Sequence, residues 1–172
     1  MIEVRPTTLD GVLVVRPPTI FRDFRGVYVE TWNRAAYEAA GIRVEFVQDD
    51  VSVSGRNVLR GLHGDDVTWK LVSCLAGAFH LVVLNYDRAS PQFGRWEAFA
   101  LSEENRLQVL VPPRFANGHL VTTERAIFHY KQSTYYDRAR QFTVRWDDPR
   151  FAIAWPTRAP ILSARDAGAA DA

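Results

Sequence analysis

Short runs of β-branched and aromatic residues follow one another along most of the chain. Turn residues (Gly, Pro, Asn and Asp) separate these runs at intervals of about ten residues, a spacing typical of a β-sandwich or barrel. We therefore predict an all-β fold, a two-sheet jelly roll of about ten strands with a few short helices. The predicted strands cover residues 11–17, 44–54, 57–63, 69–77, 78–86, 95–101, 107–113, 118–123, 126–133 and 142–146.

One segment differs from this strand pattern. Residues 33–41 read NRAAYEAAG, which predicts a helix with Asn33 as the N-cap and Gly41 just after the last turn. The whole chain of 172 residues suits a single domain, 1–172, with a frayed tail after about residue 167.

The overall composition excludes several classes of partner. The formal net charge is +1, so we expect neither nucleic acid nor an anionic membrane as a partner. We expect no signal peptide, no membrane span and a cytoplasmic location, because the start is charged and no apolar run approaches roughly 18 residues. The single cysteine, Cys74, lies in an apolar run and is expected to be a buried structural thiol.

The stretch LRGLHGDDVTWK, residues 59–70, contains a histidine between two glycines. His63 could be a metal ligand, a proton-transfer base or a loop residue without a task. Many metal sites in jelly rolls use two histidines one residue apart, but here Gly61 and Asp65 occupy the alternate positions around His63. Ligands can still converge from different strands, so the metal hypothesis stays open at this point.

Two other segments are polar enough to be functional. FRDFRGVYVE, residues 21–30, contains Arg25 and Glu30, which alone could be surface charges on an edge strand. AIFHYKQSTYYDRARQ, residues 126–141, contains Tyr130 and two further tyrosines, which alone could be core or rim residues.

Together these segments match a known family. LRGLH is followed in order by KLV, SPxFG, VPPRFANGH, YKxxxYY, WDDPRFAIAWP and LSARD, between about Gly11 and Asp166. This series resembles the dTDP-4-dehydrorhamnose 3,5-epimerase family. The resemblance implies a jelly roll of the cupin superfamily, a homodimer, and neither a metal nor another cofactor. It also implies epimerisation of carbons that flank the 4-keto group of a nucleotide-linked 6-deoxy sugar, in deoxysugar or surface-polysaccharide biosynthesis.

The resemblance assigns catalytic roles to four residues. Such a reaction needs a base to remove the proton next to the ketone, a group that stabilises the enolate, and an acid on the opposite face of the sugar. In the family, the histidine of RGLH is the base, and here it is His63. Asp166 would orient and stabilise that imidazole, Tyr130 would be the opposite-face acid, and Lys70 would stabilise the enolate.

The resemblance also implies substrate contacts. Arg60 matches an arginine that contacts the diphosphate. Arg25 and Glu30 match an N-terminal arm that reaches the nucleotide of the neighbouring subunit, and Gln48 and Tyr135 match contacts on the side of the nucleobase. His129 precedes Tyr130 on the same predicted strand, so it should point to the other face and be structural.

Several positions depart from the family pattern. The loop after His63 is short (GDDVTW), and the usual GFAHGF becomes RFANGHL, so that Asn117 replaces a histidine and His119 is new. His80 stands where an aspartate is common, and Asp50 replaces an asparagine near the nucleobase. This variant pattern resembles a subgroup acting on GDP-linked 4-keto-6-deoxy-heptoses, and a carboxylate at position 50 would suit the N–H donors of guanine. Alternatively, these changes only repack the pocket around a different sugar.

Three other functions remain open at this point: a metal-dependent cupin enzyme, a non-catalytic module that binds sugar nucleotides, and a 3,4-ketoisomerase.

The proposed site also sets a geometric condition on the strand that contains Arg60 and His63. Arg60 and His63 are three residues apart, and a regular strand would put them on opposite faces. A bend near Gly61, or the end of the strand, is needed to bring both side chains into one site.

Overall fold

The computed structural model describes residues 2–168, so the tail predicted to fray lies almost entirely outside the described range. Its residues form thirteen strands, one short α-helix and one 3-10 helix (Arg138–Arg140), which confirms the predicted all-β jelly roll. The strands are β1 (Glu3–Pro6), β2 (Leu13–Arg16), β3 (Ile20–Asp23), β4 (Gly26–Val29), β5 (Gln48–Gly55), β6 (Leu59–Gly64), β7 (Lys70–Ala76), β8 (Ala78–Asn85), β9 (Trp96–Ser102), β10 (Gln108–Val111), β11 (Phe115–Val121), β12 (Arg125–Gln132) and β13 (Phe142–Thr143).

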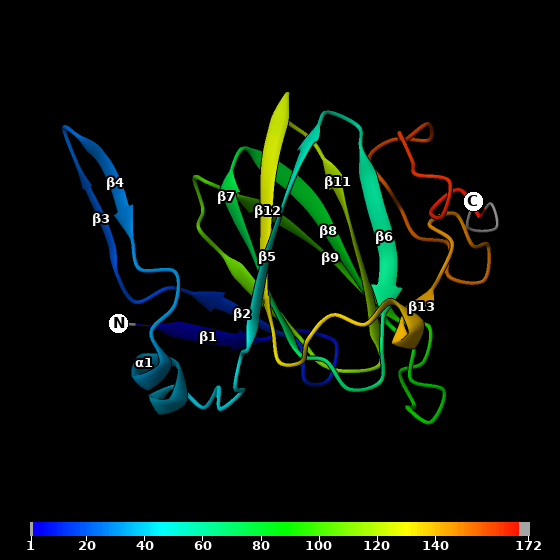
Figure 1. Cartoon of the computed structure of the whole chain (residues 1–172), viewed down its shortest axis with the longest axis horizontal. Coiled ribbons are helices and arrows are strands. Elements are labelled where there is room, and N and C mark those ends of the chain that lie inside the picture. The colour runs from blue at the N-terminus through cyan, green and yellow to red at the C-terminus, as the bar shows by residue number, and fades with distance from the viewer. Residues whose placement is uncertain (1, 169–172) are drawn as a thin grey trace.

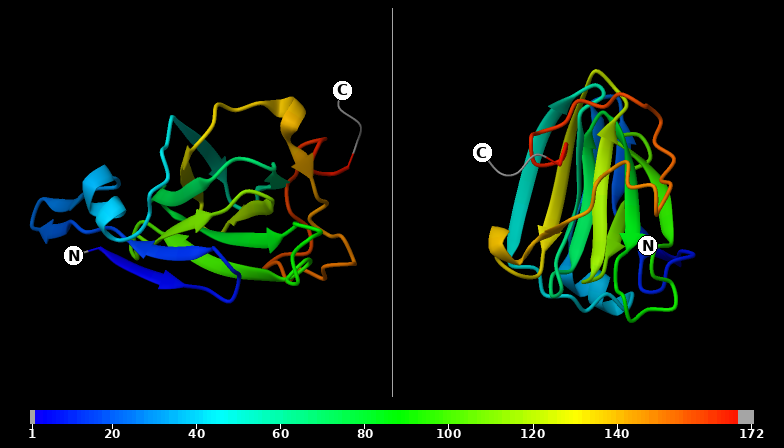
Figure 2. Two further views of the ribbon diagram at one scale, coloured as in Figure 1. Left: turned by 90° about the horizontal axis from the view of Figure 1, so that it is seen from below. Right: turned by 90° about the vertical axis from the view of Figure 1, so that its right-hand side faces the viewer.

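Two antiparallel sheets face each other and form the sandwich (Figures 1 and 2). The larger sheet has the order β1-β2-β10-β7-β12-β5, and the smaller one has the order β13-β6-β11-β8-β9. A third, separate hairpin consists of β3 and β4. Apolar side chains from both sheets meet in the main core, where Val72, Leu81 and Val109 are completely buried.

Each predicted strand overlaps an observed one, but three strands are missing from the prediction. β1, β3 and β4 have only four residues each and carry charged or exposed side chains, so they lack the apolar pattern on which the prediction rested. The strand predicted over 118–123 was placed too late, because β11 already begins at Phe115. Its stretch FANG looks like a turn in sequence, yet it is paired on both sides, with β6 and β8.

The predicted helix is confirmed as α1 (Arg34–Ala39). The side chain of Asn33 accepts a hydrogen bond from the backbone N–H of Ala36 at 3.2 Å, as an N-cap should. Tyr37 is completely buried against the larger sheet, and its hydroxyl donates to Gln108 Oε1 at 2.5 Å. The helix therefore covers part of the outer face of that sheet (Figure 1).

The β3–β4 hairpin projects away from the sandwich (Figure 1). It exposes large apolar side chains, and Phe24 at its tip is 97% exposed. Arg25 at the same turn forms an ion pair with Asp23 at 2.6 Å. Within residues 2–168 no helix has the length and apolar character needed to cross a membrane.

Candidate active site

A cavity of about 440 Å³ opens between the two sheets. Strands β6 and β11 of the smaller sheet, β5, β7 and β12 of the larger sheet, and the segment after β12 all contribute to its walls. The residues that line it are Ser52, Arg60, His63, Lys70, Asn117, His119, Phe128, Tyr130, Tyr136, Arg138, Gln141, Ser163, Arg165 and Asp166. All four predicted catalytic residues thus meet in one cavity, together with Arg60, Asn117 and His119.

His63 and Asp166 form a close pair of ionisable side chains in the cavity. His63 Nε2 lies 2.7 Å from Asp166 Oδ1, although 103 residues separate them in sequence. The backbone N–H of Gly61 donates to Asp166 Oδ2 at 3.4 Å, and the Asp166 N–H donates to Ser163 Oγ at 3.2 Å. The carboxylate is therefore held in place from two directions, and it can fix the orientation of the imidazole.

Asp166 is ionised despite its burial. Its side chain is only 4% exposed, and burial alone would raise the pKa of the carboxyl. The hydrogen bond and charge of His63, and the hydrogen bonds from Gly61 and Ser163, outweigh burial, so that the pKa of Asp166 lies below its usual value. An ionised carboxylate stabilises a positively charged His63, which is what a base needs once it has accepted a proton.

The bend required between Arg60 and His63 is present. His63 pairs with Asn117 and Arg60 pairs with His119, so three steps along β6 match two steps along β11. This bulge places both side chains in the cavity. Gly61 has a φ of +120°, and a Cβ there would lie 2.5 Å from the Cα of Gly118, so only glycine fits this position.

Lys70 is buried in the cavity wall without an acidic partner. Its side chain donates to Asn117 Oδ1 at 3.5 Å, and no ion pair among residues 2–168 includes it. Burial lowers the pKa of Lys70, and the charge of Arg165 lowers it further, while Asp65 opposes the shift. A cationic Lys70 would therefore gain from a negative charge that develops in the cavity.

Tyr130 faces the cavity from β12. Burial raises the pKa of its phenol, and the nearby carboxylate of Asp50 raises it further. Lys70 Nζ lies 5.9 Å from the centre of the Tyr130 ring. Tyr130 is therefore protonated at neutral pH and can serve only as a proton donor or a hydrogen-bonding group.

His119 belongs to an aromatic wall of the cavity. Its ring stacks on Phe128 with ring centres 4.0 Å apart and an interplanar angle of 7°. Burial lowers the pKa of His119 to about 3, and the positive charge of Arg60 acts in the same direction. The imidazole is therefore neutral at physiological pH.

The other predicted substrate contacts lie at different distances from this cavity. Gln48 and Asp50 are joined by a hydrogen bond of 2.9 Å and adjoin the cavity through Tyr136 and Tyr130. Tyr135 is 76% exposed and is not among the lining residues, whereas its neighbour Tyr136 is. Arg25 and Glu30 lie at the tip and the base of the projecting hairpin, and neither lines the cavity.

The sequence analysis missed several lining residues. Ser52 and Phe128 could have been found, because each lies two positions from a predicted site residue on the same strand. Tyr136, Arg138, Gln141, Ser163 and Arg165 come from irregular segments, in which no periodic pattern tells which side chains point inward. Lys70, Arg60, Arg138 and Arg165 together make the lining rich in cations.

Three further predictions concern residues outside the site. His129 points away from the cavity and lies 3.6 Å from Asp49 on the outer face, as predicted. His80 was one of the changes interpreted as repacking the pocket, but it does not line the cavity and lies next to Trp155, with ring centres 6.0 Å apart. Cys74 is buried, and burial raises the pKa of its thiol to about 12, in agreement with a structural role.

The short loop after His63 closes by its own hydrogen bonds. Asp65 is buried and accepts from the backbone N–H groups of Val67 and Thr68 at 2.9 and 2.6 Å. Trp69 packs into the apolar cluster beside α1. This aspartate therefore has a structural task. No group of three or more His, Cys, Asp or Glu residues in the described part of the chain is arranged to hold a metal ion.

Comparisons with known proteins identify the family. The sequence model described as dTDP-4-dehydrorhamnose 3,5-epimerase matches residues 6–172. The enzyme of that name from Salmonella typhimurium is 39% identical over 98% of this chain and 94% of its own length. The crystal structure of dTDP-6-deoxy-D-glucose-3,5-epimerase from Legionella pneumophila, in complex with dTDP-4-keto-L-rhamnose, superimposes with a TM-score of 0.92 at 38% identity, covering 98% of this chain and 92% of that one.

A third relative catalyses a narrower reaction. The 3′-monoepimerase ChmJ from Streptomyces bikiniensis, solved in complex with dTDP-quinovose, has a TM-score of 0.88 at 32% identity and covers 95% of this chain and 85% of its own. The names of all three relatives contain dTDP, so the GDP-heptose subgroup that the sequence departures suggested is not supported and the dTDP type is favoured. The chain belongs to the dTDP-4-dehydrorhamnose 3,5-epimerase family and is an epimerase.

Proposed function

We propose that this protein epimerises C3, C5 or both of a dTDP-linked 4-keto-6-deoxy sugar. The observation that carries the proposal is the His63–Asp166 pair, with its 2.7 Å contact, in the same cavity as Lys70 and Tyr130. A base, a cation and a protonated phenol in one enclosed space are the groups that enolate formation and reprotonation require.

The first step is removal of a proton from the carbon next to the ketone. His63 accepts that proton, and the ionised Asp166 behind it stabilises the resulting imidazolium. The electron pair left on the carbon moves to the ketone oxygen as an enolate. Lys70 supports this step, because within residues 2–168 its ammonium has only the neutral Asn117 side chain as a hydrogen-bond acceptor.

In the second step, Tyr130 gives its phenol proton to the same carbon from the other side of the ring. The two groups come from opposite sheets, since His63 lies on β6 and Tyr130 on β12. A proton removed by one and replaced by the other inverts the configuration. The phenolate and the imidazolium then exchange protons with solvent before the next turnover.

The dTDP group would occupy the cation-rich part of the cavity. Arg60 would contact the diphosphate, with Asn117 and His119 close to the sugar, and Gln48 and Tyr135 on the nucleobase side. The names of the relatives support dTDP. The argument for guanine loses force, because Asp50 Oδ2 already accepts hydrogen bonds from the side chains of Gln48 and Gln132 at 2.9 and 2.8 Å.

The proposal includes a homodimer. The projecting β3–β4 hairpin of each subunit would bring Arg25 and Glu30 to the nucleotide of its neighbour. The exposed apolar residues Phe21, Phe24 and Tyr28 on this hairpin support the proposal, because they have no covering partner within one described chain.

Solvent exchange tests the proposed reaction. In D₂O, the enzyme should incorporate deuterium at C3, C5 or both of a dTDP-4-keto-6-deoxy sugar, as measured by NMR and mass spectrometry. His63→Ala should lower this exchange by at least about 10³-fold. His129→Ala is the matched control, because His129 faces away from the cavity, and it should retain exchange. Absence of exchange in the wild type with both dTDP- and GDP-linked substrates would refute the proposal.

A further inference from the structure

Asp50 and Tyr130 stand directly opposite each other on β5 and β12. Opposite residues of an antiparallel pair project from the same face of the sheet, and Tyr130 shows that this face is the one turned to the cavity. The next pair on that face is Gln48 opposite Gln132. Asp50 is therefore an immediate neighbour of the proposed acid, at a position where the family motif has an asparagine.

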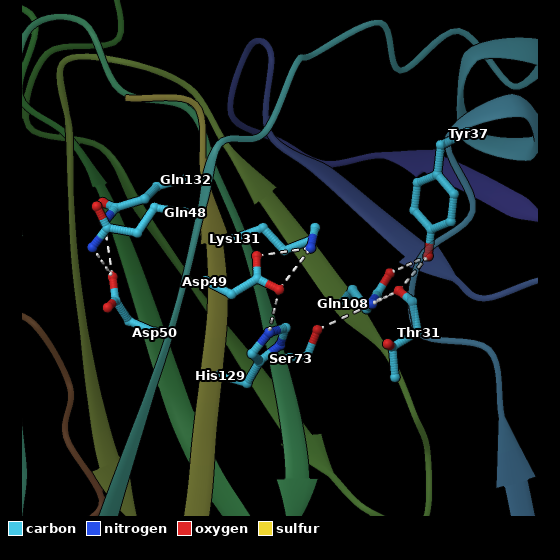
Figure 3. A network of polar contacts seen from close by, with 10 residues as sticks. All are labelled: Thr31, Tyr37, Gln48, Asp49, Asp50, Ser73, Gln108, His129, Lys131 and Gln132. Carbon is cyan, nitrogen blue, oxygen red and sulfur yellow. Dashed lines mark hydrogen bonds and ion pairs between the residues drawn. The ribbon is translucent and has the colours of Figure 1, made fainter. Parts of the chain in front are cut away.

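Two neutral amides hold the carboxylate of Asp50. Oδ2 accepts from Gln48 Nε2 at 2.9 Å and from Gln132 Nε2 at 2.8 Å (Figure 3). Gln132 is 2% exposed, so the carboxylate is anchored to a buried side chain. No ion pair among residues 2–168 includes Asp50, and its negative charge is oriented but not neutralised.

This charge acts on the hydroxyl of Tyr130. The carboxylate favours the protonated phenol, because a phenolate opposite it would be repelled. Few other groups face Tyr130. Tyr136 follows on the loop after β12, Lys70 lies 5.9 Å from the ring on β7, and Arg60 and His63 line the opposite wall.

The consequence concerns which group returns the proton. To protonate the enolate, Tyr130 must lose its proton, and its oxygen must become negative beside the carboxylate of Asp50. His63 meets no such obstacle. Once His63 has exchanged its proton with solvent, it can return a deuteron to the original face, which gives exchange without inversion.

We propose that Asp50 is a positioning residue that acts through Tyr130. Its charge slows proton delivery from that side, so that part of the enolate is reprotonated by His63. This inference rests on the proposed function and concerns its stereochemical outcome. In this role Asp50 limits inversion, so the ratio of inversion to exchange should change when this one side chain is replaced.

The test is Asp50→Asn, assayed in D₂O for inversion and deuterium incorporation on the same sample. Asn keeps the shape and one acceptor oxygen but removes the charge. Removal of this charge makes Tyr130 a stronger acid and should raise the ratio of inversion to exchange by about threefold, given an intermediate Brønsted dependence. Asp49→Asn is the matched control, since it removes a carboxylate from the same strand on the outer face and should leave the ratio unchanged.

An unchanged ratio in a folded Asp50→Asn protein would overturn the inference. A second measurement avoids dependence on the folding of that variant. The ultraviolet titration of the wild type minus that of Tyr130→Phe gives the ionisation of Tyr130, which should occur well above pH 10. Ionisation near pH 10 would equally overturn the inference. A wild type that neither exchanges nor inverts any 4-keto substrate would instead refute the proposed function, while the titration would still test the contact.

Discussion

The two faces of the β5–β12 strand pair both carry an aspartate, but these aspartates have different partners (Figure 3). On the outer face, Asp49 accepts from Lys131 Nζ at 2.7 and 2.8 Å and lies 3.6 Å from His129. On the inner face, Asp50 is held by neutral amides, and Lys70 on the neighbouring strand β7 donates to the amide of Asn117. Within residues 2–168, Asp49 and Lys131 form an ion pair on the outer face, whereas Asp50 and Lys70 form none. The comparison teaches that charged side chains without an ion partner in the described chain can mark the face of a sheet that binds a ligand.

The largest difference between the cavity and the outer face of the β5–β12 pair should appear when a carboxylate is removed. Asp166→Asn takes away the charge behind His63, and we expect kcat to fall on the order of 10³-fold, because the imidazolium loses its stabilisation. Asp49→Asn removes a carboxylate from the outer face and should change kcat by less than about twofold. Steady-state kinetics on both variants measures this difference, and equal losses would show that the inner pair has no special role.

Replacing each lysine by methionine separates activity from stability. Lys70→Met should lower kcat by about 10²-fold, because the enolate loses its cation. The same change should leave the melting temperature equal or higher, because a buried ammonium without an acidic partner is removed. Lys131→Met should spare activity and lower the free energy of unfolding by about 1 kcal/mol, through loss of its ion pair with Asp49. Thermal melts in which Lys70→Met is less stable than Lys131→Met would contradict this prediction.

A smaller effect distinguishes His119, on β11 in the cavity wall, from His129 on the outer face of β12. His119 stays neutral in the folded state down to a pH of about 3, whereas in the unfolded chain it binds a proton below about pH 6.5. As the pH falls from 6.5 toward 3, the unfolded state therefore gains a proton that the folded state does not, and stability decreases by about 1.4 kcal/mol per pH unit.

His119→Phe should remove this loss, which amounts to about 2 kcal/mol between pH 6.5 and pH 5. His129→Phe should change the pH dependence less, because Asp49 opposes the effect of burial on the pKa of His129. Urea denaturation at the two pH values compares the variants with the wild type. A wild-type slope that persists in His119→Phe would mean that other groups cause it.

The sequence predicted those parts of the molecule that depend on local pattern. The jelly roll, the capped helix at Asn33 and the outward direction of His129 all follow from periodicity or end signals. The bend at Gly61 was also predicted, because two cavity residues three positions apart cannot share a face on a regular strand.

Other features depend on pairings between distant segments. The position of Asp50 opposite Tyr130 is set by the register of β5 and β12, which are about 80 residues apart in sequence, and no local pattern reveals that register. Whether Tyr135 or Tyr136 turns inward is decided by an irregular loop. The short strands of the β3–β4 hairpin carry too little apolar pattern to be detected.

The bulge at Gly61 also sets a rule for how this stretch can vary. Two residues separate Arg60 from His63, and this number cannot change, because a gain or loss of one residue would turn Arg60 or His63 out of the cavity. Gly61 must stay glycine, and a Cβ at its neighbour Gly118 would lie only 3.0 Å from the backbone oxygen of Arg60. Engineering of this site should therefore keep the spacing of the RGLH stretch fixed, and seek new specificity on β11 and in the segment after β12.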